Sequence, residues 1–297
     1  MIYRDLGRTG ERVSLIGLGG FHIGEKPTRE EGVGLIREAI DRGVTFMDNS
    51  WDYNDGESDR RFKDALQGIY RDQVLLMTKV DGRTKKAVRQ QLDESLLRMG
   101  VDHIDLLQLH EIIRWDDPDR AYAPGGAVEG FDEARRGGKI RFTGFTGHKE
   151  PKMFLEMLES DYAWDTVQMP LNVLDAHHNS FEKQVLPVLV ERGIGVLGMK
   201  PLCAGKLFES GADVTAAEGL HYAMNLATDV VITGIQSRQD LQQALEAAET
   251  FHPMDEDEVR ELLSRTAEVA AGGRFEEYKT TDRHDGTERN PQWLVAA

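Results

Sequence analysis

Short apolar stretches alternate with longer amphipathic segments along most of the chain, and this alternation restricts the fold more than any other feature. The predicted strands lie within residues 15–20, 45–50, 74–80, 103–110, 140–147, 166–172, 194–201 and 230–235. Apolar residues at helical spacing lie between them, as in 29–43, 85–100 and 241–249. Connections of this length do not form hairpins, so the strands should pair in parallel. Eight such units in ~250 residues fit a closed (β/α)8 TIM barrel better than an open sheet.

The main rival architecture is an open, doubly wound dinucleotide-binding sheet. Residues 17–24 read GLGGFHIG, which is close to the glycine motif of such sheets. The G-x-G-x-x-G spacing fails, because His22 stands where the third glycine belongs. The next helix is expected to begin only near Thr28, too late for its N-terminus to adjoin the glycines. We therefore interpret this stretch as a tight strand end.

The length of the chain allows one large barrel or two modest domains. It has 297 residues, of which 40% are hydrophobic and 30% charged. Repeats, low-complexity segments and an obvious linker are absent from the sequence. We expect one barrel domain over residues 1–297, with an N-terminal hairpin at about 1–14 and a C-terminal helix and tail at about 255–297.

Charge and cysteine content limit the partners and the compartment. The formal net charge is -16 and Cys203 is the single cysteine, so an internal disulfide is excluded. An acidic surface repels nucleic acid and anionic lipid. The first ten residues lack the apolar core of a secretory signal, and no apolar run approaches the ~20 residues of a membrane span. We expect a cytoplasmic protein without nucleic-acid or membrane partners, in which any phosphate-bearing ligand is bound by a local positive site.

Polar residues follow the predicted strands at the end where barrel enzymes carry their chemistry. Asp48, Lys79 and His110 end the second, third and fourth strands, and Tyr53 follows Asp48 by five residues. Gln168 and Asn172 lie around the sixth strand. The carboxyl ends of the strands all meet at one barrel mouth, so these side chains should lie together there. Each residue taken alone has an ordinary structural explanation, but their occurrence on successive strands favours a site.

This combination of residue types suits proton transfer to a carbonyl oxygen. Asp48 should keep a buried Lys79 charged, and a charged lysine should lower the pKa of the Tyr53 phenol from about 10. Tyr53 would then donate a proton near neutral pH. A neutral His110 would donate a hydrogen bond to the same oxygen.

A second, independent signal follows the eighth strand. Gly234 ends the strand, Ser237 is placed to cap the next helix, and Arg238 occupies the first helical turn. A helix N-terminus after the seventh or eighth strand is the usual phosphate site of this barrel. The helix dipole disfavours a basic residue in the first turn, and a bound anion would explain it. An ordinary surface arginine beside a capping serine is the alternative.

Several stretches resemble the motifs of the aldo-keto reductase family, in the same order and along nearly the whole chain. They are LGRTGERVSLIGLGG, FMDNSWDYNDGES, LLMTKV, VDHIDLLQLH, GKIRFTGFTGH, QMPLN, MKPLCAGKL and ITGIQS. The resemblance implies an NAD(P)H-dependent oxidoreductase that reduces an aldehyde or ketone by direct hydride transfer. It also implies that Asp48, Tyr53, Lys79 and His110 form the catalytic tetrad, with Tyr53 as general acid.

The resemblance further implies an extended nicotinamide dinucleotide across the barrel mouth. Its expected contacts are Gly20, Phe21, Asp48, Thr146, Gly147, Gln168, Met199, Pro201, Leu202, Gly205, Lys206, Gly234, Ser237 and Arg238. Arg238 favours NADPH over NADH, because a guanidinium suits a 2'-phosphate. The chain departs from the family at Thr146-Gly147, where many members have Ser-Asn, and at Met199, where an aromatic commonly stacks on the nicotinamide. These departures leave Gln168, with His148 as a second candidate, to bind the carboxamide.

The substrate is expected to be a small carbonyl compound. Trp51, Glu111, Trp115 and Asn172 are the predicted substrate contacts, and the tail either folds back over the opening with Trp293 or frays. Glu111 suits a hydroxylated or cationic substrate. No metal site is expected, because His177-His178 lack the cysteine or carboxylate pattern of one.

Two other functions remain open. One is a cofactor-binding regulatory or redox-sensing barrel subunit with little turnover, which the departures around the carboxamide permit. The other is a barrel lyase that uses Lys79 as a Schiff-base nucleophile. That chemistry needs an uncharged lysine, and Asp48 opposes it.

Overall fold

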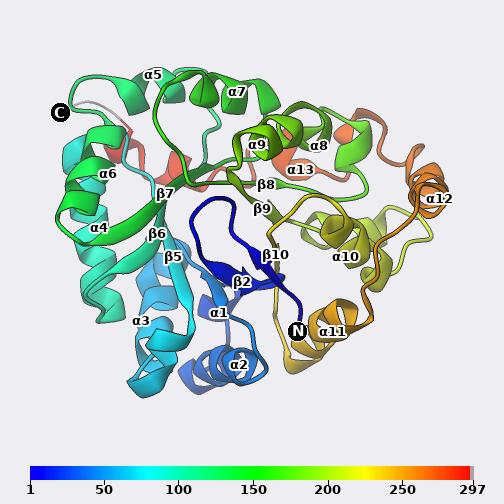
Figure 1. Cartoon of the computed structure of the whole chain (residues 1–297), viewed down its shortest axis with the longest axis horizontal. Coiled ribbons are helices and arrows are strands. Elements are labelled where there is room, and N and C mark those ends of the chain that lie inside the picture. The colour runs from blue at the N-terminus through cyan, green and yellow to red at the C-terminus, as the bar shows by residue number, and fades with distance from the viewer. Residues whose placement is uncertain (295–297) are drawn as a thin grey trace.

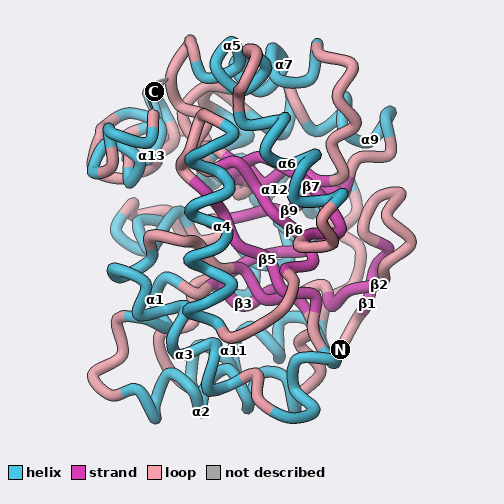
Figure 2. Tube along the Cα trace, turned by 90° about the vertical axis from the view of Figure 1, so that its left-hand side faces the viewer, coloured by secondary structure: helices cyan, strands magenta, loops and turns pink. Residues whose placement is uncertain are grey.

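The computed structural model describes residues 1–294, and over this range eight parallel strands close into one barrel (Figure 1, Figure 2). In chain order they are β3 (Ile16–Gly19), β4 (Phe46–Asp48), β5 (Leu75–Val80), β6 (Ile104–Leu109), β7 (Ile140–Thr146), β8 (Thr166–Pro170), β9 (Gly195–Met199) and β10 (Val230–Thr233). Each strand pairs with the next along the chain, and β10 returns to β3 with Val231 opposite Ile16. The predicted (β/α)8 barrel is confirmed, and the open dinucleotide-binding sheet is excluded.

Helices connect consecutive strands and form a layer around the barrel, cyan around magenta in Figure 2. The longer ones are α2 (Arg29–Asp41), α3 (Glu57–Ala65), α4 (Lys85–Met99), α6 (Ala127–Arg136), α7 (Pro151–Glu159), α9 (Leu186–Arg192), α10 (Ala216–Asn225) and α11 (Arg238–Thr250). Short helices and 3-10 turns join them: α5 (Asp117–Tyr122), α8 (Phe181–Gln184), η1 (Tyr53–Gly56), η2 (Gly68–Gln73), η3 (Asp175–His177) and η4 (Cys203–Glu209).

The helix boundaries follow from capping residues that the sequence displays. Thr28 begins α2 with a capping box, in which its side chain accepts from the Glu31 amide and the Glu31 carboxylate accepts from the Thr28 amide. Thr84 and Ser237 cap α4 and α11 through their hydroxyl oxygens. The helices predicted within 29–43, 85–100 and 241–249 are confirmed at these positions.

One local expectation at the end of β3 is wrong. A four-residue helix, α1 (Phe21–Gly24), follows Gly20 directly, whereas the sequence suggested no helix before Thr28. The glycines therefore do adjoin a helical turn, although a turn this short has few unpaired amides aligned along one axis. Gly20 itself is required by close packing, since a Cβ there would lie 2.6 Å from Asn49 Oδ1.

The N-terminal hairpin closes the bottom of the barrel. Strands β1 (Tyr3–Asp5) and β2 (Arg12–Ser14) pair antiparallel, with Tyr3 opposite Ser14, as the sequence predicted for residues 3–14. Leu6 and Val13 of this hairpin pack against side chains of the barrel interior, among them Phe46 and Leu106. Apolar side chains thus fill the N-terminal end of the barrel, so a polar site can form only at the opposite mouth.

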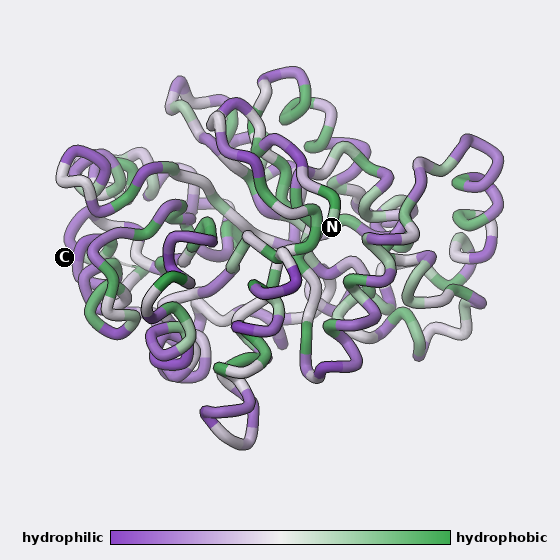
Figure 3. The backbone as a smooth tube through the Cα atoms, turned by 60° about the horizontal axis from the view of Figure 1, so that its bottom comes forward, coloured by the Kyte–Doolittle hydropathy of each residue, from purple (hydrophilic) through white to green (hydrophobic). Residues whose placement is uncertain are grey.

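The largest buried cluster lies between the barrel and the helix layer. It joins strand residues such as Leu107 and Val167 to helix residues such as Ile36 and Phe131. In Figure 3, hydrophobic and hydrophilic residues alternate along the helices that surround the barrel. This pattern is the physical origin of the helical periodicity seen in the sequence.

The C-terminal segment returns to the barrel mouth after the last barrel helix. It contains α12 (Glu256–Thr266), η5 (Ala271–Gly273), α13 (Glu277–Thr280), η6 (Gly286–Arg289) and η7 (Pro291–Trp293). The Arg83 amide donates to Trp293 O at 3.0 Å, and Arg120 donates to Leu294 O at 2.6 Å. The tail therefore folds back over the opening; its last residues, 295–297, lie outside the described part. None of the described helices is both long and apolar enough to cross a membrane.

Candidate active site

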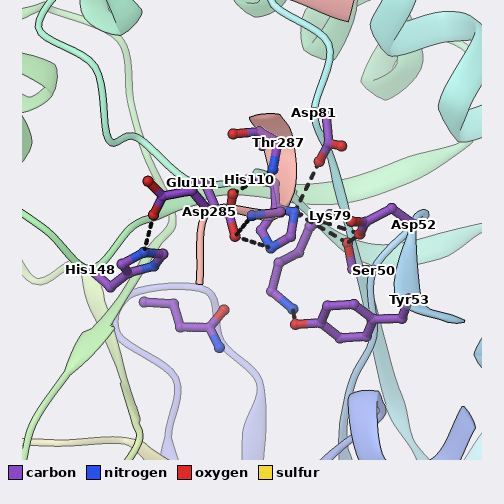
Figure 4. Close-up of polar contacts among 12 residues, drawn as sticks. Ser50, Asp52, Tyr53, Lys79, Asp81, His110, Glu111, His148, Asp285 and Thr287 are labelled. Atoms are coloured by element: carbon purple, nitrogen blue, oxygen red, sulfur yellow. Dashed lines mark hydrogen bonds and ion pairs between the residues drawn. The ribbon is translucent and has the colours of Figure 1, made fainter. Parts of the chain in front are cut away.

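A lysine, a carboxylate and a phenol lie in direct contact at the carboxyl ends of β4 and β5. Figure 4 shows the contact between Lys79 and the Tyr53 hydroxyl. Asp48 is the last residue of β4, Lys79 is in β5, and Tyr53 begins η1, which follows β4. Lys79 Nζ donates to Asp48 Oδ1, to Asn49 O at 2.8 Å and to the Tyr53 hydroxyl oxygen at 3.1 Å. The ammonium group thus uses all three of its donors.

Burial makes this contact chemically significant. The Lys79 and Asp48 side chains are 2% and 5% exposed, so little water screens their interaction. A lysine with three acceptors and an adjacent carboxylate is held in its charged form. This geometry opposes the Schiff-base lyase, which needs Lys79 as an uncharged nucleophile.

The expected direction of the Tyr53 pKa is wrong. Burial of the phenol raises its pKa well above the ordinary value, and the carboxylates of Asp48, Asp52 and Glu111 add to the increase. The sequence predicted a lowered pKa because it placed Lys79 beside the phenol. It did not show how many carboxylates surround the same phenol. Tyr53 therefore stays protonated throughout the neutral range.

His110 directly follows β6 and lies beside Tyr53, with ring centroids 6.0 Å apart. Its Nδ1 is 2.9 Å from Asp81 Oδ1, 3.4 Å from Ser50 Oγ and 3.8 Å from Asp52 Oδ1. Burial lowers the pKa of this imidazole, but Glu111, Asp81 and Asp52 outweigh burial and raise it. The direction of this shift runs against the neutral His110 expected from the sequence, because the surrounding carboxylates favour the charged imidazole more than water does.

Carboxylates form a group around His110. Burial and the neighbouring Asp81 raise the pKa of Asp52, while His110 works in the opposite direction. Asp52, Asp81 and His110 each place one possible ligand atom within 4.8 Å of the others, a spacing that a metal ion could use. Direct contacts already account for the group, since His110 Nδ1 pairs with Asp81 and the Ser50 hydroxyl donates to Asp52 Oδ1 at 2.7 Å.

Gln168 reaches the same cluster from β8. Its Nε2 donates to Asp48 Oδ2 at 2.9 Å, while its buried Oε1 has no hydrogen-bond partner within the described residues. Thr146 and Gly147, at the end of β7, lie near Gln168, because β7 pairs with β8 and Thr146 is opposite Gln168. A Cβ on Gly147 would lie 2.4 Å from Ile112 O, so only glycine fits this position.

The stretch after β9 carries several predicted cofactor contacts. Pro201 and Leu202 lead from Met199 into η4, where Gly205 has a φ of +87° and Lys206 pairs with Glu209 at the surface. Lys200 was not among the contacts predicted from the sequence, and its Nζ lies 3.5 Å from Met199 Sδ. Burial lowers the pKa of Lys200 to about 8, and Lys79 contributes in the same direction.

The predicted anion site after β10 has the expected backbone but a different charge arrangement. Ser237 caps α11 by accepting from the Asp240 amide, and His22 packs on Gly234. Arg238 does not lie alone beside this helix start, because its Nε is 2.7 Å from Glu38 Oε2 on α2. Glu38 therefore accounts for the basic residue that the sequence analysis explained by a bound anion.

The four predicted substrate contacts do not behave alike. Trp51 is nearly buried and donates from Nε1 to Glu94, whereas Trp115 is 58% exposed. Asn172 is fully buried and donates to Tyr278 Oη at 2.9 Å and to Lys200 O. With its oxygen also accepting the Leu174 and Asp175 amides, Asn172 has a structural role, and its contact with a substrate stays a prediction.

Glu111 also differs from its predicted role. Its carboxylate accepts the amides of Gly286 at 3.0 Å and Thr287 at 2.7 Å, both from the C-terminal tail. Burial opposes its ionisation, but His110, His148 and these two amides hold its pKa below the usual range. Glu111 therefore anchors the tail instead of presenting both oxygens to a substrate.

The tail contributes polar groups that the sequence analysis did not place at the site. Asp285 lies 3.3 Å from His148 Nε2, and Asn290 Nδ2 donates to Asp81 Oδ2 at 3.2 Å. Trp293 stacks edge to face on Trp51, with centroids 6.0 Å apart. Asp81 was detectable in the sequence, because it directly follows β5, whereas no local pattern marks Asp285 or Asn290.

The fold and the site together define a (β/α)8-barrel enzyme whose ionisable residues gather at the carboxyl mouth. The chain belongs to the Aldo/keto reductase family, whose sequence model matches residues 15–219, more than half of the chain.

Individual relatives agree with this assignment. L-galactose dehydrogenase of Arabidopsis thaliana is 29% identical over 228 residues, which span 70% of this chain and 67% of that protein. L-glyceraldehyde 3-phosphate reductase of Escherichia coli O157:H7 is 25% identical over 228 residues, 70% of this chain and 63% of that protein. Among solved structures, an aldo-keto reductase from Klebsiella pneumoniae in complex with NADPH has a TM-score of 0.73 at 22% identity, covering 90% of this chain and 96% of that one. The last likeness concerns the fold.

Proposed function

We propose that the protein reduces the carbonyl group of a small aldehyde or ketone to an alcohol, using NADPH in preference to NADH, with Tyr53 as general acid. The observation that carries this proposal is the buried contact of the Tyr53 hydroxyl with Lys79 Nζ, at 3.1 Å. Lys79 is in turn held by Asp48, so the phenol meets a fixed positive charge at the barrel mouth.

The residues present fit a nicotinamide dinucleotide. The unpartnered Oε1 of Gln168 offers an acceptor for a carboxamide beside Asp48 and Lys79. The Ser237-capped start of α11 suits a phosphate. The NADPH complex of the Klebsiella pneumoniae relative supports the same choice of cofactor. When bound, the reduced nicotinamide supplies the hydride for the carbonyl carbon.

The chain's own residues supply the proton and the charge. Tyr53 holds its proton through the neutral range because its pKa is raised, and it releases that proton only as negative charge develops on the substrate oxygen. Lys79 then stabilises the phenolate that Tyr53 becomes, and Asp48 keeps Lys79 charged and oriented. His110 lies on the neighbouring side of the phenol, where it can donate to the substrate oxygen.

The substrate class follows from what surrounds Tyr53. Phe21 stacks edge to face on Tyr53 at 5.4 Å, so an aromatic ring lies on one side of the phenol, while His110 lies beside it with Asp52 and Glu111 as charged neighbours. This mixture suits a small hydroxylated carbonyl compound better than a hydrocarbon aldehyde. The names of the relatives, which refer to L-galactose and to L-glyceraldehyde 3-phosphate, support that class.

Replacement of Tyr53 by phenylalanine tests the proposal. With NADPH and glyceraldehyde, Tyr53→Phe should lower kcat by about 100-fold or more, because it removes the proton donor. NADPH binding, measured by fluorescence, should stay close to that of the unaltered protein. Tyr70→Phe in η2, away from the site, is the matched control. Equal activity of Tyr53→Phe and the unaltered protein would refute Tyr53 as the acid, and failure of the unaltered protein to bind either cofactor would refute the function.

A further inference from the structure

His110 has a hydrogen-bonding environment that decides where its protons lie. The acceptors around Nδ1 are the Asp81 carboxylate at 2.9 Å and the Ser50 hydroxyl oxygen at 3.4 Å. The Ser50 hydroxyl gives its own proton to Asp52 Oδ1 at 2.7 Å, so its lone pair faces the imidazole. Nδ1 therefore meets only acceptors, and it must carry a proton.

The proton on Nδ1 limits what the other ring nitrogen, Nε2, can do. A neutral histidine has one proton, and with that proton on Nδ1 its Nε2 can only accept a hydrogen bond. A carbonyl oxygen offers only lone pairs, so a neutral His110 could not bind it through Nε2. Donation from Nε2 requires the doubly protonated ring.

The surroundings favour this charged ring. Asp81 and Asp52 lie on its Nδ1 side, and Glu111 Oε1 lies 4.0 Å from Nε2. On the remaining side Tyr53 contacts the ring edge to face, and Lys79 donates to the Tyr53 hydroxyl oxygen. Three carboxylates thus lie 2.9, 3.8 and 4.0 Å from the ring nitrogens of His110.

The backbone around the ring is fixed by Arg83. This fully buried guanidinium donates to Asp81 O, His110 O and Glu111 O, each at 2.8 Å. Its Nε pairs with Asp117 at 2.7 Å. A single planar group therefore sets the spacing between His110 and two of its three carboxylates.

The C-terminal tail keeps the carboxylates of Asp81 and Glu111 in place. Asn290 holds the second oxygen of Asp81, and the amides of Gly286 and Thr287 hold the two oxygens of Glu111. Because Glu111 is fixed 4.0 Å from Nε2, beyond hydrogen-bond distance, the Nε2 proton remains available to a ligand.

We propose that Asp81 is a positioning residue for His110, and that His110 acts in carbonyl reduction as an imidazolium, with Nδ1–H bound by Asp81 and Nε2–H directed to the carbonyl oxygen. This inference rests on the proposed function. His110 transfers no proton in this scheme, because the proton that ends on the alcohol comes from Tyr53. The imidazolium stabilises the charge that develops on the oxygen during hydride transfer.

Nuclear magnetic resonance tests the protonation state without any turnover. Proton–nitrogen correlation spectra of the full chain at neutral pH should show His110 with protons on both ring nitrogens, its signals being assigned by their loss in His110→Gln. A ring with one proton at neutral pH would overturn the proposal. Because this readout does not need a reaction, it stays informative even if no carbonyl is reduced and the proposed function fails.

The pH profile of Asp81→Asn tests the positioning role. Asparagine keeps an oxygen for Nδ1–H but removes one negative charge, so the alkaline fall in kcat with glyceraldehyde should move to lower pH by about one unit or more. Activity below that fall should return to within a few-fold of the unaltered protein, and NADPH binding should not change. Asp102→Asn is the matched control, because Asp102 is exposed just before β6, at the opposite end from His110. An unshifted profile, or a uniform loss of activity at every pH, would overturn the role of Asp81.

Discussion

Charge at single residues of this site depends on the sum of neighbours and not on one partner. Tyr53 has Lys79 at 3.1 Å, yet burial and nearby carboxylates still raise its pKa. Arg238 shows the same principle at the surface, where Glu38 on another helix occupies the guanidinium. A pairwise reading of the sequence therefore brought Lys79 to Tyr53 correctly, but it missed the carboxylates around Tyr53 and the Glu38 partner of Arg238.

Arg238 provides a residue-scale prediction about cofactor choice. Glu38→Gln removes the carboxylate that competes for Arg238, whose side chain is 76% exposed. Exposed ion pairs contribute about 1 kcal/mol or less, so the Kd of NADPH should fall by about two- to five-fold. The Kd of NADH should stay constant, because NADH lacks the 2'-phosphate. Fluorescence titration with each cofactor measures both constants, and Arg238→Ala should have the opposite effect. An equal change for both cofactors would show that Arg238 does not bind the 2'-phosphate.

At the scale of secondary-structure elements, Asp59 connects α3 to α4 and to the loop after β4. It is fully buried and accepts from Asn49 Nδ2 at 2.7 Å and from Ser95 Oγ at 3.3 Å. Arg98 Nη1 lies 3.7 Å away. Burial raises the Asp59 pKa to about 8, and the partly exposed Arg98 only reduces the increase. Desolvation therefore outweighs the ion pair at this junction.

This junction should make folding stability depend on pH. The folded pKa of Asp59, about 8, lies above the unfolded value of about 3.9, so between these pH values the folded state holds a proton that the unfolded state releases. The free energy of unfolding should therefore fall as the pH rises through this window, by at most about 1.4 kcal/mol per pH unit from this group. The Asp59→Asn variant has no ionisable group at this position, so its free energy of unfolding should lack this contribution to the pH dependence.

Urea denaturation across the same pH range measures the effect. The difference in stability between Asp59→Asn and the unaltered protein should change in favour of the variant as the pH rises towards about 8. Asp72→Asn, at an exposed position of η2, controls for the loss of one carboxyl group. Parallel pH curves for Asp59→Asn and the unaltered protein would contradict the assignment.

At the scale of the whole molecule, the C-terminal tail makes distant parts of the chain into one site. Glu111 accepts two tail amides, and Asp81 accepts Asn290, more than 170 residues away in each case. The barrel supplies the proposed catalytic cluster, and the tail supplies the contacts that fix the carboxylates of Asp81 and Glu111 beside it. The site therefore depends on the tail as well as on the eight strands.

Hydrogen exchange should detect this docking. The amides of Gly286 and Thr287 are bonded to an ionised Glu111 and should exchange slowly. Glu111→Gln leaves one acceptor oxygen for two amides, so exchange at this pair should accelerate by about 10-fold or more. The Thr281 amide, bonded to Glu277 O, is an internal reference. Glu288→Gln, at an exposed neighbouring position, should leave the pair unchanged. Rapid exchange of both amides in the unaltered protein would mean that the tail is not docked in solution.

The sequence by itself determined the barrel, because strand and helix periodicities are local and directly reflect which face of each element is buried. It also determined the cluster of Asp48, Lys79 and Tyr53, because the carboxyl ends of parallel strands converge on one mouth. Only the tertiary structure decided that Asn172 is a structural residue, that Glu111 binds the tail, and that His110 lies among three carboxylates. These facts depend on contacts between residues far apart in the chain and on the desolvation of whole groups of charges, and neither leaves a local pattern in the sequence.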